Sequence, residues 1–327
     1  MKSKFLDLLI KLILLIAVGL VFYYQILAKA NIDEILVLFL ERRQSSSSWP
    51  LIFALLLVPV NWGLETKKWQ SLLTTFYQTS FFQTYKAVLA GITVSLITPN
   101  RVGEYGGRVV FLPDGYRWHG TVSTLVGSFA QLIALLTFGL IALFGLTLGQ
   151  FEITNLILAA YFMLSGLLIT LLFLLYFNLP IVVKTVRKLP YWNKWKKYFS
   201  PLKAIQKFPS IQLRKALIFA CLRYLLYFFQ YFLLASYFGI EIGLLDSFLV
   251  IGTIFLVQTS IPLPPIWSLL VRGQAALYFW GLFEANPIAI LASTFALWVI
   301  NLILPSLFGL LLLMSTNIPK TLGYEEK

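Results

Sequence analysis

A charged segment lies inside an apolar stretch of the chain, in the sequence 95-SLITPNRVGEYGGRVVFL-112. Arg101 and Glu104 are three residues apart, and Glu104 and Arg108 are four apart, so on a helix all three lie close to one face. Guanidinium groups on both sides of a carboxylate can hold a phosphate, because their planar forks match its oxygens. Charges inside a bilayer cost about 2.5 to 3.5 kcal/mol each on insertion scales. We therefore interpret the segment as an anion site.

The backbone of this segment supports the same interpretation. A helix is expected to end before Pro99, because the residue preceding a proline avoids the α region, and Asn100 can cap a new helix that begins near Arg101. The free N–H groups at that helix N-terminus would then contribute to binding a phosphate. Glycines keep the new helix thin enough for a ligand or another helix to approach. They are Gly103, Gly106 and Gly107.

An ion pair that only stabilises a turn is the alternative interpretation. In the anion site, Arg101 and Arg108 bind the phosphate, and Glu104 orients an arginine or discriminates among head groups. In the alternative, the three charges only neutralise one another. An arginine at a helix N-terminus is electrostatically unfavourable unless an anion shares the position, and this favours the site.

The composition places these charges in an integral membrane protein. Of 327 residues, 59% are hydrophobic and 12% are charged, which is more apolar surface than a soluble core of this size could bury. The net charge of +13 is concentrated beside apolar spans, so it indicates membrane orientation and anionic lipid rather than nucleic acid. A single cysteine and a single histidine cannot form a disulfide framework or a zinc cluster, and we expect no cofactor.

Six apolar segments are long enough to cross a hydrocarbon core about 30 Å thick. They lie near residues 6–28, 49–66, 122–148, 154–177, 216–238 and 288–315. Two further regions, near 84–120 and 245–284, are interrupted by proline, glycine and charge, and we interpret them as re-entrant hairpins. The sequence thus predicts an all-α polytopic membrane protein of about eight apolar segments, in one domain over residues 1–327.

The basic loop 178–215 predicts the orientation in the membrane. It holds ten lysines and arginines and no acidic residue, so the positive-inside rule makes it cytoplasmic. Counting the crossings from this loop places both termini in the cytoplasm and the chain in the inner (cytoplasmic) cell membrane. The first apolar segment is interpreted as an uncleaved helix, because no small-residue cleavage site follows it.

The second hairpin, 258-QTSIPLPPIWSLLVRGQAALYFWGLFEANP-287, repeats the pattern of the first. Its Pro262 lies 163 residues after Pro99, half the chain, and the two hairpins would enter the membrane from opposite faces. This pattern is typical of an inverted repeat, in which broken helices form a site near the membrane midplane. Arg272 follows the second break without an acidic neighbour in its own segment. Its partner is a bound anion or a distant acid, Glu104 or Glu284, unless it snorkels to the outer interface.

Polar residues near the ends of other spans have simpler interpretations. Charged and aromatic residues at the end of the second span predict an interfacial anchor. They are Glu65, Lys67, Lys68 and Trp69. Asn301, with Pro305 in the last span, indicates helix packing rather than a ligand site.

The segment 98-TPNRVGEYGGR-108, preceded by 84-TYKAVLAGITVSLI-97, resembles the P-G-R-x-G-E hairpin of the lysylphosphatidylglycerol synthase transmembrane-region family. The second hairpin, followed by 297-LWVINLILPSLFGLLLL-313, is similar to the C-terminal half of that family. The resemblance implies a flippase-like lipid-handling domain, which full-length synthases fuse to a soluble aminoacyl-transferase domain. Because this chain ends soon after its last predicted span, we do not expect it to aminoacylate lipid itself.

The match to the first motif is close and the match to the second is looser. The residues that match in the first hairpin are Pro99, Arg101, Gly103 and Glu104, while Asn100 replaces the usual glycine. In the second hairpin Arg272 matches, but Gly273 stands where a glutamate often follows.

We therefore expect a transporter rather than an enzyme, one that moves an anionic phospholipid or a polyprenyl-phosphate-linked lipid within the bilayer. The expected substrate-binding residues are Asn100, Arg101, Gly103, Glu104, Arg108 and Arg272. One alternative is an integral membrane enzyme that modifies lipid with Glu104 as general base. The other is a scaffold that recruits a separate soluble transferase through the loop 178–215.

Overall fold

The computed structural model describes residues 2–22, 32–45, 48–98, 101–188, 200–260 and 265–317. These residues are mostly helical, and they contain no strand. Five stretches of helix are long and apolar enough to cross a membrane. They are α3 (Trp49–Leu73), η3 with α6 (Asp114–Tyr116 and Arg117–Gln150), α7 (Asn155–Phe177), α10 (Ser210–Tyr237), and α13 (Pro287–Trp298) with η5 (Val299–Ile303) and α14 (Leu304–Met314). The prediction of an all-α polytopic membrane protein is confirmed.

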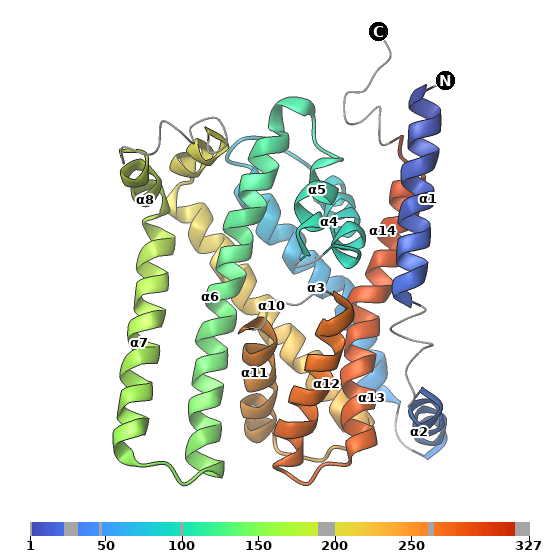
Figure 1. Ribbon diagram of the computed structural model, residues 1–327, viewed down its shortest axis with the longest axis vertical. Coiled ribbons are helices and arrows are strands. Elements are labelled where there is room, and N and C mark those ends of the chain that lie inside the picture. Colours follow the sequence, from blue (N-terminus) through green and yellow to red (C-terminus); the bar gives the residue numbers. More distant parts are fainter. Residues whose placement is uncertain are drawn as a thin grey trace.

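The five stretches coincide with five of the six predicted crossings. The remaining prediction, 6–28, falls on α1 (Lys2–Phe22), and its last residues lie outside the described part of the chain. α1 packs against α4 (Phe81–Leu96) and α14. Figure 1 shows α1 along one edge of the molecule, and α2 (Ile32–Ser45) below it.

The two interrupted regions form two pairs of short helices. α4 packs against α5 (Gly103–Val109), and α11 (Leu244–Ser260) packs against α12 (Pro265–Gly281). A helix of seven residues is only about 10 Å long, too short to cross a bilayer. Figure 1 shows α4 and α5 in the upper half of the molecule and α11 and α12 in the lower half. This is the arrangement expected of hairpins that enter from opposite faces.

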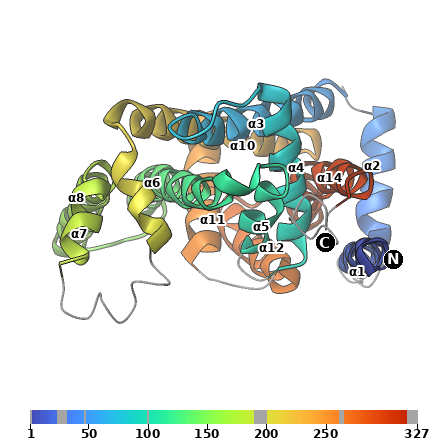
Figure 2. The same cartoon turned by 90° about the horizontal axis from the view of Figure 1, so that it is seen from above.

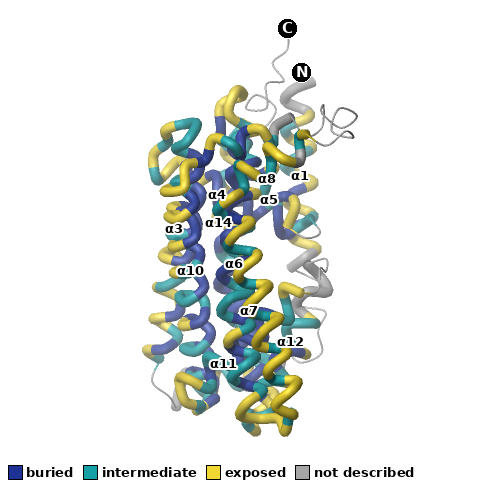
Figure 3. The backbone as a smooth tube through the Cα atoms, turned by 90° about the vertical axis from the view of Figure 1, so that its left-hand side faces the viewer, coloured by how far each residue is buried: buried dark blue, intermediate teal, exposed yellow. Residues whose placement is uncertain are grey.

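The helices bury their inner faces and leave apolar side chains on the outside. α7 has one buried residue, Tyr176, although it is among the most apolar helices of the chain. An exposed apolar face of this size is typical of contact with lipid. Figure 3 shows buried residues gathered on the inner sides of the helices, and Figure 2 shows α3 and α10 running together along one side of the bundle.

The segments that are predicted to face the cytoplasm lie at one end of the molecule. The start of α1, the end of α14, and the short helices α8 (Leu179–Val186) and η4 (Ser200–Lys207) lie at the same end of the molecule (Figure 1). α8 and η4 belong to the predicted basic loop 178–215, of which residues 189–199 lie outside the described part.

Close contact between α4 and α5 depends on glycine. A Cβ atom at Gly107 would lie 2.7 Å from both the carbonyl oxygen of Ala90 and the Cα atom of Gly91, which are backbone atoms that cannot move aside. At the adjacent Gly106, nothing lies within 4 Å of a Cβ atom. The two glycines therefore form a matched pair in one short helix.

We expect Gly107→Ala to destabilise the protein by about 1 to 3 kcal/mol, because overpacking pushes α5 away from α4. Gly106→Ala should be neutral or stabilising by up to about 1 kcal/mol, because alanine is the better helix former. Denaturant unfolding of the two variants in detergent micelles measures the difference. Equal stability of the two variants would contradict the packing that we describe.

Candidate functional site

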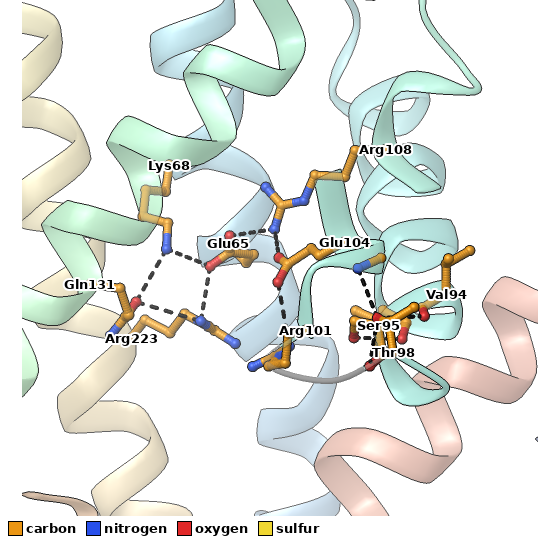
Figure 4. Close-up of polar contacts among 12 residues, drawn as sticks. Glu65, Lys68, Val94, Ser95, Thr98, Arg101, Glu104, Arg108, Gln131 and Arg223 are labelled. Carbon is orange, nitrogen blue, oxygen red and sulfur yellow. Dashed lines mark hydrogen bonds and ion pairs between the residues drawn. The ribbon is translucent and has the colours of Figure 1, made fainter. Parts of the chain in front are cut away.

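A buried glutamate on α3 is the centre of an ion-pair cluster (Figure 4). Glu65 is 4% exposed, and its carboxylate contacts three basic side chains. The distances from its oxygens are 2.7 Å to Lys68 Nζ, 2.7 Å to Arg108 Nη2 and 2.9 Å to Arg223 Nη1. The three bases come from α3, α5 and α10, so one carboxylate joins three helices.

The hairpin tip extends this cluster toward the surface. Nη2 of Arg108 also donates to the carboxylate of Glu104, and Nη2 of Arg101 lies 3.7 Å from the other oxygen of Glu104. The structure thus brings Arg101, Glu104 and Arg108 together on one side, as their spacing predicts. Their exposure differs greatly: the side chain of Arg108 is 2% exposed, and that of Arg101 is 48% exposed.

Amide side chains complete the hydrogen bonding on the inner side of the cluster. Lys68 donates to Oε1 of Gln131 over 3.2 Å, and Nε of Arg223 donates to Oδ1 of Asn61 over 3.0 Å. Asn61 in turn donates to Oδ1 of Asn301 over 2.7 Å. The predicted packing role of Asn301 therefore holds, since it ties η5 to α3. The same contact connects η5 to the charged cluster.

Tryptophan rings cover two of the guanidinium groups. The Arg108 guanidinium lies 5.3 Å from the ring of Trp69, and the Arg223 guanidinium lies 4.8 Å from the ring of Trp62. Such contacts stabilise a cation that is removed from water. Gly91 on α4 makes room for the Arg108 stem, because a Cβ there would lie 2.7 Å from its Cγ.

The backbone at the hairpin tip differs from the predicted helix N-terminus. Arg101 has φ = 59°, in the left-handed region, and α5 begins only at Gly103. The N–H of Arg101 bonds to the carbonyl of Thr98, and the N–H of Gly103 bonds to the Thr98 hydroxyl over 2.7 Å. The prediction that these N–H groups are free for a phosphate is wrong, because Thr98 accepts from both. Asn100, the predicted cap, lies outside the described residues.

Gly103 has a packing role at the hairpin tip, and its predicted role toward a ligand stays a prediction. A Cβ atom at this position would overlap the carbonyl oxygen of Val94 and the hydroxyl of Thr98. A glycine is therefore needed for the hairpin to close. Its place in the predicted site is next to Glu104, where it positions the chain that carries the charges.

Arg272 is separate from the cluster in its contacts. It is half-buried on α12, and within the described residues it forms no ion pair. Glu104 and Glu284 are both described and neither pairs with it, so the two acids named as candidate partners are excluded in this structure.

Sequence reasoning missed three charged members of the cluster. The predicted interfacial anchor is wrong for Glu65, Lys68 and Trp69, which are all at least nine-tenths buried. It stays a prediction for Lys67, which is exposed and lies 5.0 Å from the ring of Phe81. Arg223 was not identified at all, although a lone arginine in the apolar segment 216–238 is the signal that singled out Arg272.

The described cluster carries more positive than negative charge. Its bases are Lys68, Arg101, Arg108 and Arg223, and its acids are Glu65 and Glu104, so four positive charges against two negative ones leave a formal excess of two. Buried charge without a partner is costly in a low-dielectric interior. An anion at the exposed Arg101 end would reduce that excess.

The fold and the cluster define the class: an all-α polytopic membrane protein with a charged site at the tip of a helical hairpin. The family described as Lysylphosphatidylglycerol synthase TM region matches residues 8–309, and the chain belongs to that family. Comparison with curated proteins and with solved structures gave no match. Within the described residues, no group of three or more His, Cys, Asp or Glu side chains is placed to hold a metal ion.

Proposed function

We propose that the protein is a flippase-like lipid transporter that binds the head group of an anionic lipid at Arg101. The observation that carries this proposal is the combination of a half-exposed arginine and a buried cluster with a formal excess of positive charge behind it. A phosphate at Arg101 would gain charge-assisted hydrogen bonds and lower the electrostatic cost of the cluster.

The backbone of Arg101 supports a functional role. A non-glycine residue in the left-handed region costs about 1 to 3 kcal/mol, and such residues cluster at ligand sites. The unfavourable conformation holds the guanidinium at the end of the cluster, where its side chain is 48% exposed.

The other charged residues have different roles in this proposal from those that their types first suggest. Arg108 is 2% exposed and its Nη2 pairs with both Glu65 and Glu104, so in this proposal it orients Glu104 rather than binding the phosphate directly. Glu104 then orients Arg101 from behind. Arg272 remains a candidate ligand in the opposite hairpin, since no acid neutralises it within the described residues.

The same contacts argue against the alternative of an enzyme with Glu104 as general base. A base must accept a proton, and Glu104 lies between two arginines that stabilise its ionised form. We therefore propose transport rather than chemistry on the lipid. The scaffold alternative would act through the loop 178–215 and would leave the cluster without a ligand.

Lipid-dependent thermal stability tests the binding step. A soluble short-chain phosphatidylglycerol should raise the melting temperature in detergent, by the equivalent of about 2.7 kcal/mol at a hundredfold excess over its Kd. The phosphatidylcholine of equal chain length should shift it less, and Arg101→Ala should remove the difference. Equal shifts by both lipids in the unaltered protein would overturn the proposed anion site.

We also propose that the end of the molecule with α8 and η4 faces the cytoplasm, in the inner cell membrane. The basic residues of the loop 178–215 support this orientation. In a Cys221→Ser background, a membrane-impermeant maleimide should label Lys184→Cys only from the cytoplasmic side and Glu152→Cys only from the outer side. The reverse pattern would contradict the orientation.

A further inference from the structure

A groove lies between α3, α4 and α14, and the charged residues of the hairpin tip are not among the described residues that line it. Its volume is about 720 Å³, which is within the range of roughly 300 to 1,000 Å³ that ligand sites occupy. Its walls are almost entirely apolar, and they include Val58, Trp62, Tyr85, Leu89 and Phe308. Among the described residues that line it, Lys86 is the one that carries a charge.

Irregular helix geometry and one close contact set the shape of this groove. Pro59 lies inside α3 and lines the groove, and Pro305 follows the π-helix η5 on the α14 side. α14 is held against α4 at Gly309, where a Cβ atom would overlap the carbonyl oxygen of Leu89. The hydroxyl of Thr93 also donates to the carbonyl of Ser306 over 2.7 Å. The groove is thus formed by the packing of three helices.

The rim of the groove carries positive charge that nothing in the described structure neutralises. Lys86 is exposed. Lys67 lies over the ring of Phe81, and Phe81 is next in sequence to Phe82, which lines the groove. Neither lysine forms an ion pair with a described residue. An apolar groove below exposed lysines complements an amphiphile with an anionic head and a hydrocarbon tail.

We propose that this groove binds one acyl chain of an anionic phospholipid, with the head group of that lipid against Lys86. The bound lipid is separate from the one whose head group binds at Arg101. The inference does not depend on the proposed transport, because occupancy of the groove requires no translocation. None of the charged residues of the cluster is among the described residues that line the groove, and Trp62 contacts both: its ring lies 4.8 Å from the Arg223 guanidinium, and the residue also lines the groove.

Quenching of tryptophan fluorescence by brominated lipid tests this proposal. The full chain and Trp62→Phe are reconstituted in nanodiscs that contain phosphatidylglycerol or phosphatidylcholine with brominated chains. The difference between the two proteins isolates the signal of Trp62. We expect brominated phosphatidylglycerol to quench this signal roughly fivefold more effectively than brominated phosphatidylcholine, the ratio that one basic residue near an anionic surface can supply.

A charge reversal at the rim is the decisive variant. Lys86→Glu should abolish the preference for phosphatidylglycerol, whereas Lys184→Glu, the same change on the distant α8, should preserve it. If Trp62→Phe does not fold, Phe308→Trp provides a reporter on the opposite wall, with the same expected preference.

Three outcomes would overturn the proposal. Equal quenching by the two lipids would indicate ordinary surrounding lipid, and a preference that survives Lys86→Glu would place the head group elsewhere. Loss of the preference in Arg101→Ala would show that the groove is not a separate site. Failure of the transport proposal alone would instead remove the Arg101-dependent thermal shift and leave the quenching preference intact.

Discussion

Replacement of Arg101 by alanine is expected to reduce translocation of an anionic lipid by at least about tenfold, while the protein still folds and inserts. The loss follows because a hydrogen bond to a charged group contributes about 1.5 to 3 kcal/mol, and 1.4 kcal/mol corresponds to a factor of ten. Folding should survive because the side chain is 48% exposed and its contact with Glu104 is long, at 3.7 Å. The measurement is the initial rate of fluorescent phosphatidylglycerol movement in proteoliposomes.

Two control variants make this prediction specific. Arg101→Lys should retain part of the rate, because a lysine keeps the charge but loses the planar fork. Arg214→Ala removes an exposed arginine at the start of α10, away from the cluster, and should leave the rate unchanged. An Arg101→Ala rate equal to that of the unaltered protein would contradict the assignment of the head-group site to Arg101.

The second large effect is expected on stability, from the change Glu65→Leu. It should destabilise the protein by about 3 to 5 kcal/mol, because removing one partner of a buried ion pair leaves the other charge without compensation. Here the carboxylate compensates Lys68, Arg108 and Arg223 at once, at 2.7 to 2.9 Å. Reversible unfolding in mixed micelles measures the change in the free energy of unfolding.

A double variant separates this electrostatic cause from simple packing. Adding Arg223→Leu to Glu65→Leu should restore part of the lost stability, because one uncompensated cation is removed together with the anion. Glu152→Ala, at an exposed loop position, should change the stability by less than about 0.5 kcal/mol. Additive losses in the double variant would argue against a shared ion-pair cluster.

Much of the fold could be predicted because it depends on local sequence properties. The length and apolar character of the spans identified α3, α6, α7, α10 and the α13–α14 stretch. Proline, glycine and charge marked the two interrupted regions, since they disrupt a helix wherever they occur. Likewise, helical spacing alone brings Arg101, Glu104 and Arg108 together.

The inner half of the cluster depends on contacts that spacing along the chain does not encode. Glu65 and Arg108 are 43 residues apart and meet only because α3 packs near α5. In the sequence, a charged residue at the predicted end of a span looks like an interfacial anchor. In the structure α3 continues to Leu73, and Glu65 and Lys68 are buried within the helix bundle. Arg223 could have been identified from the cost of a lone charge in an apolar span.

The start of α5 was mispredicted because a threonine hydroxyl accepts from a backbone N–H at the hairpin tip. The sequence favours Asn100 as the cap of a helix that starts near Arg101. In the structure the Thr98 hydroxyl accepts from the N–H of Gly103, and α5 starts two residues later than expected. A threonine hydroxyl can form such a local bond to the backbone, and the close packing of Gly103 against Val94 accompanies it.

Head-group translocation by the unaltered protein is the most direct test of the proposed transport. Proteoliposomes would carry fluorescent phosphatidylglycerol, phosphatidylethanolamine or a polyprenyl phosphate, and a membrane-impermeant quencher would report how much lipid changes leaflet. We predict protein-dependent movement of an anionic lipid that exceeds that of the zwitterionic phosphatidylethanolamine. No protein-dependent movement of any of the three lipids, or equal movement of all three, would contradict it.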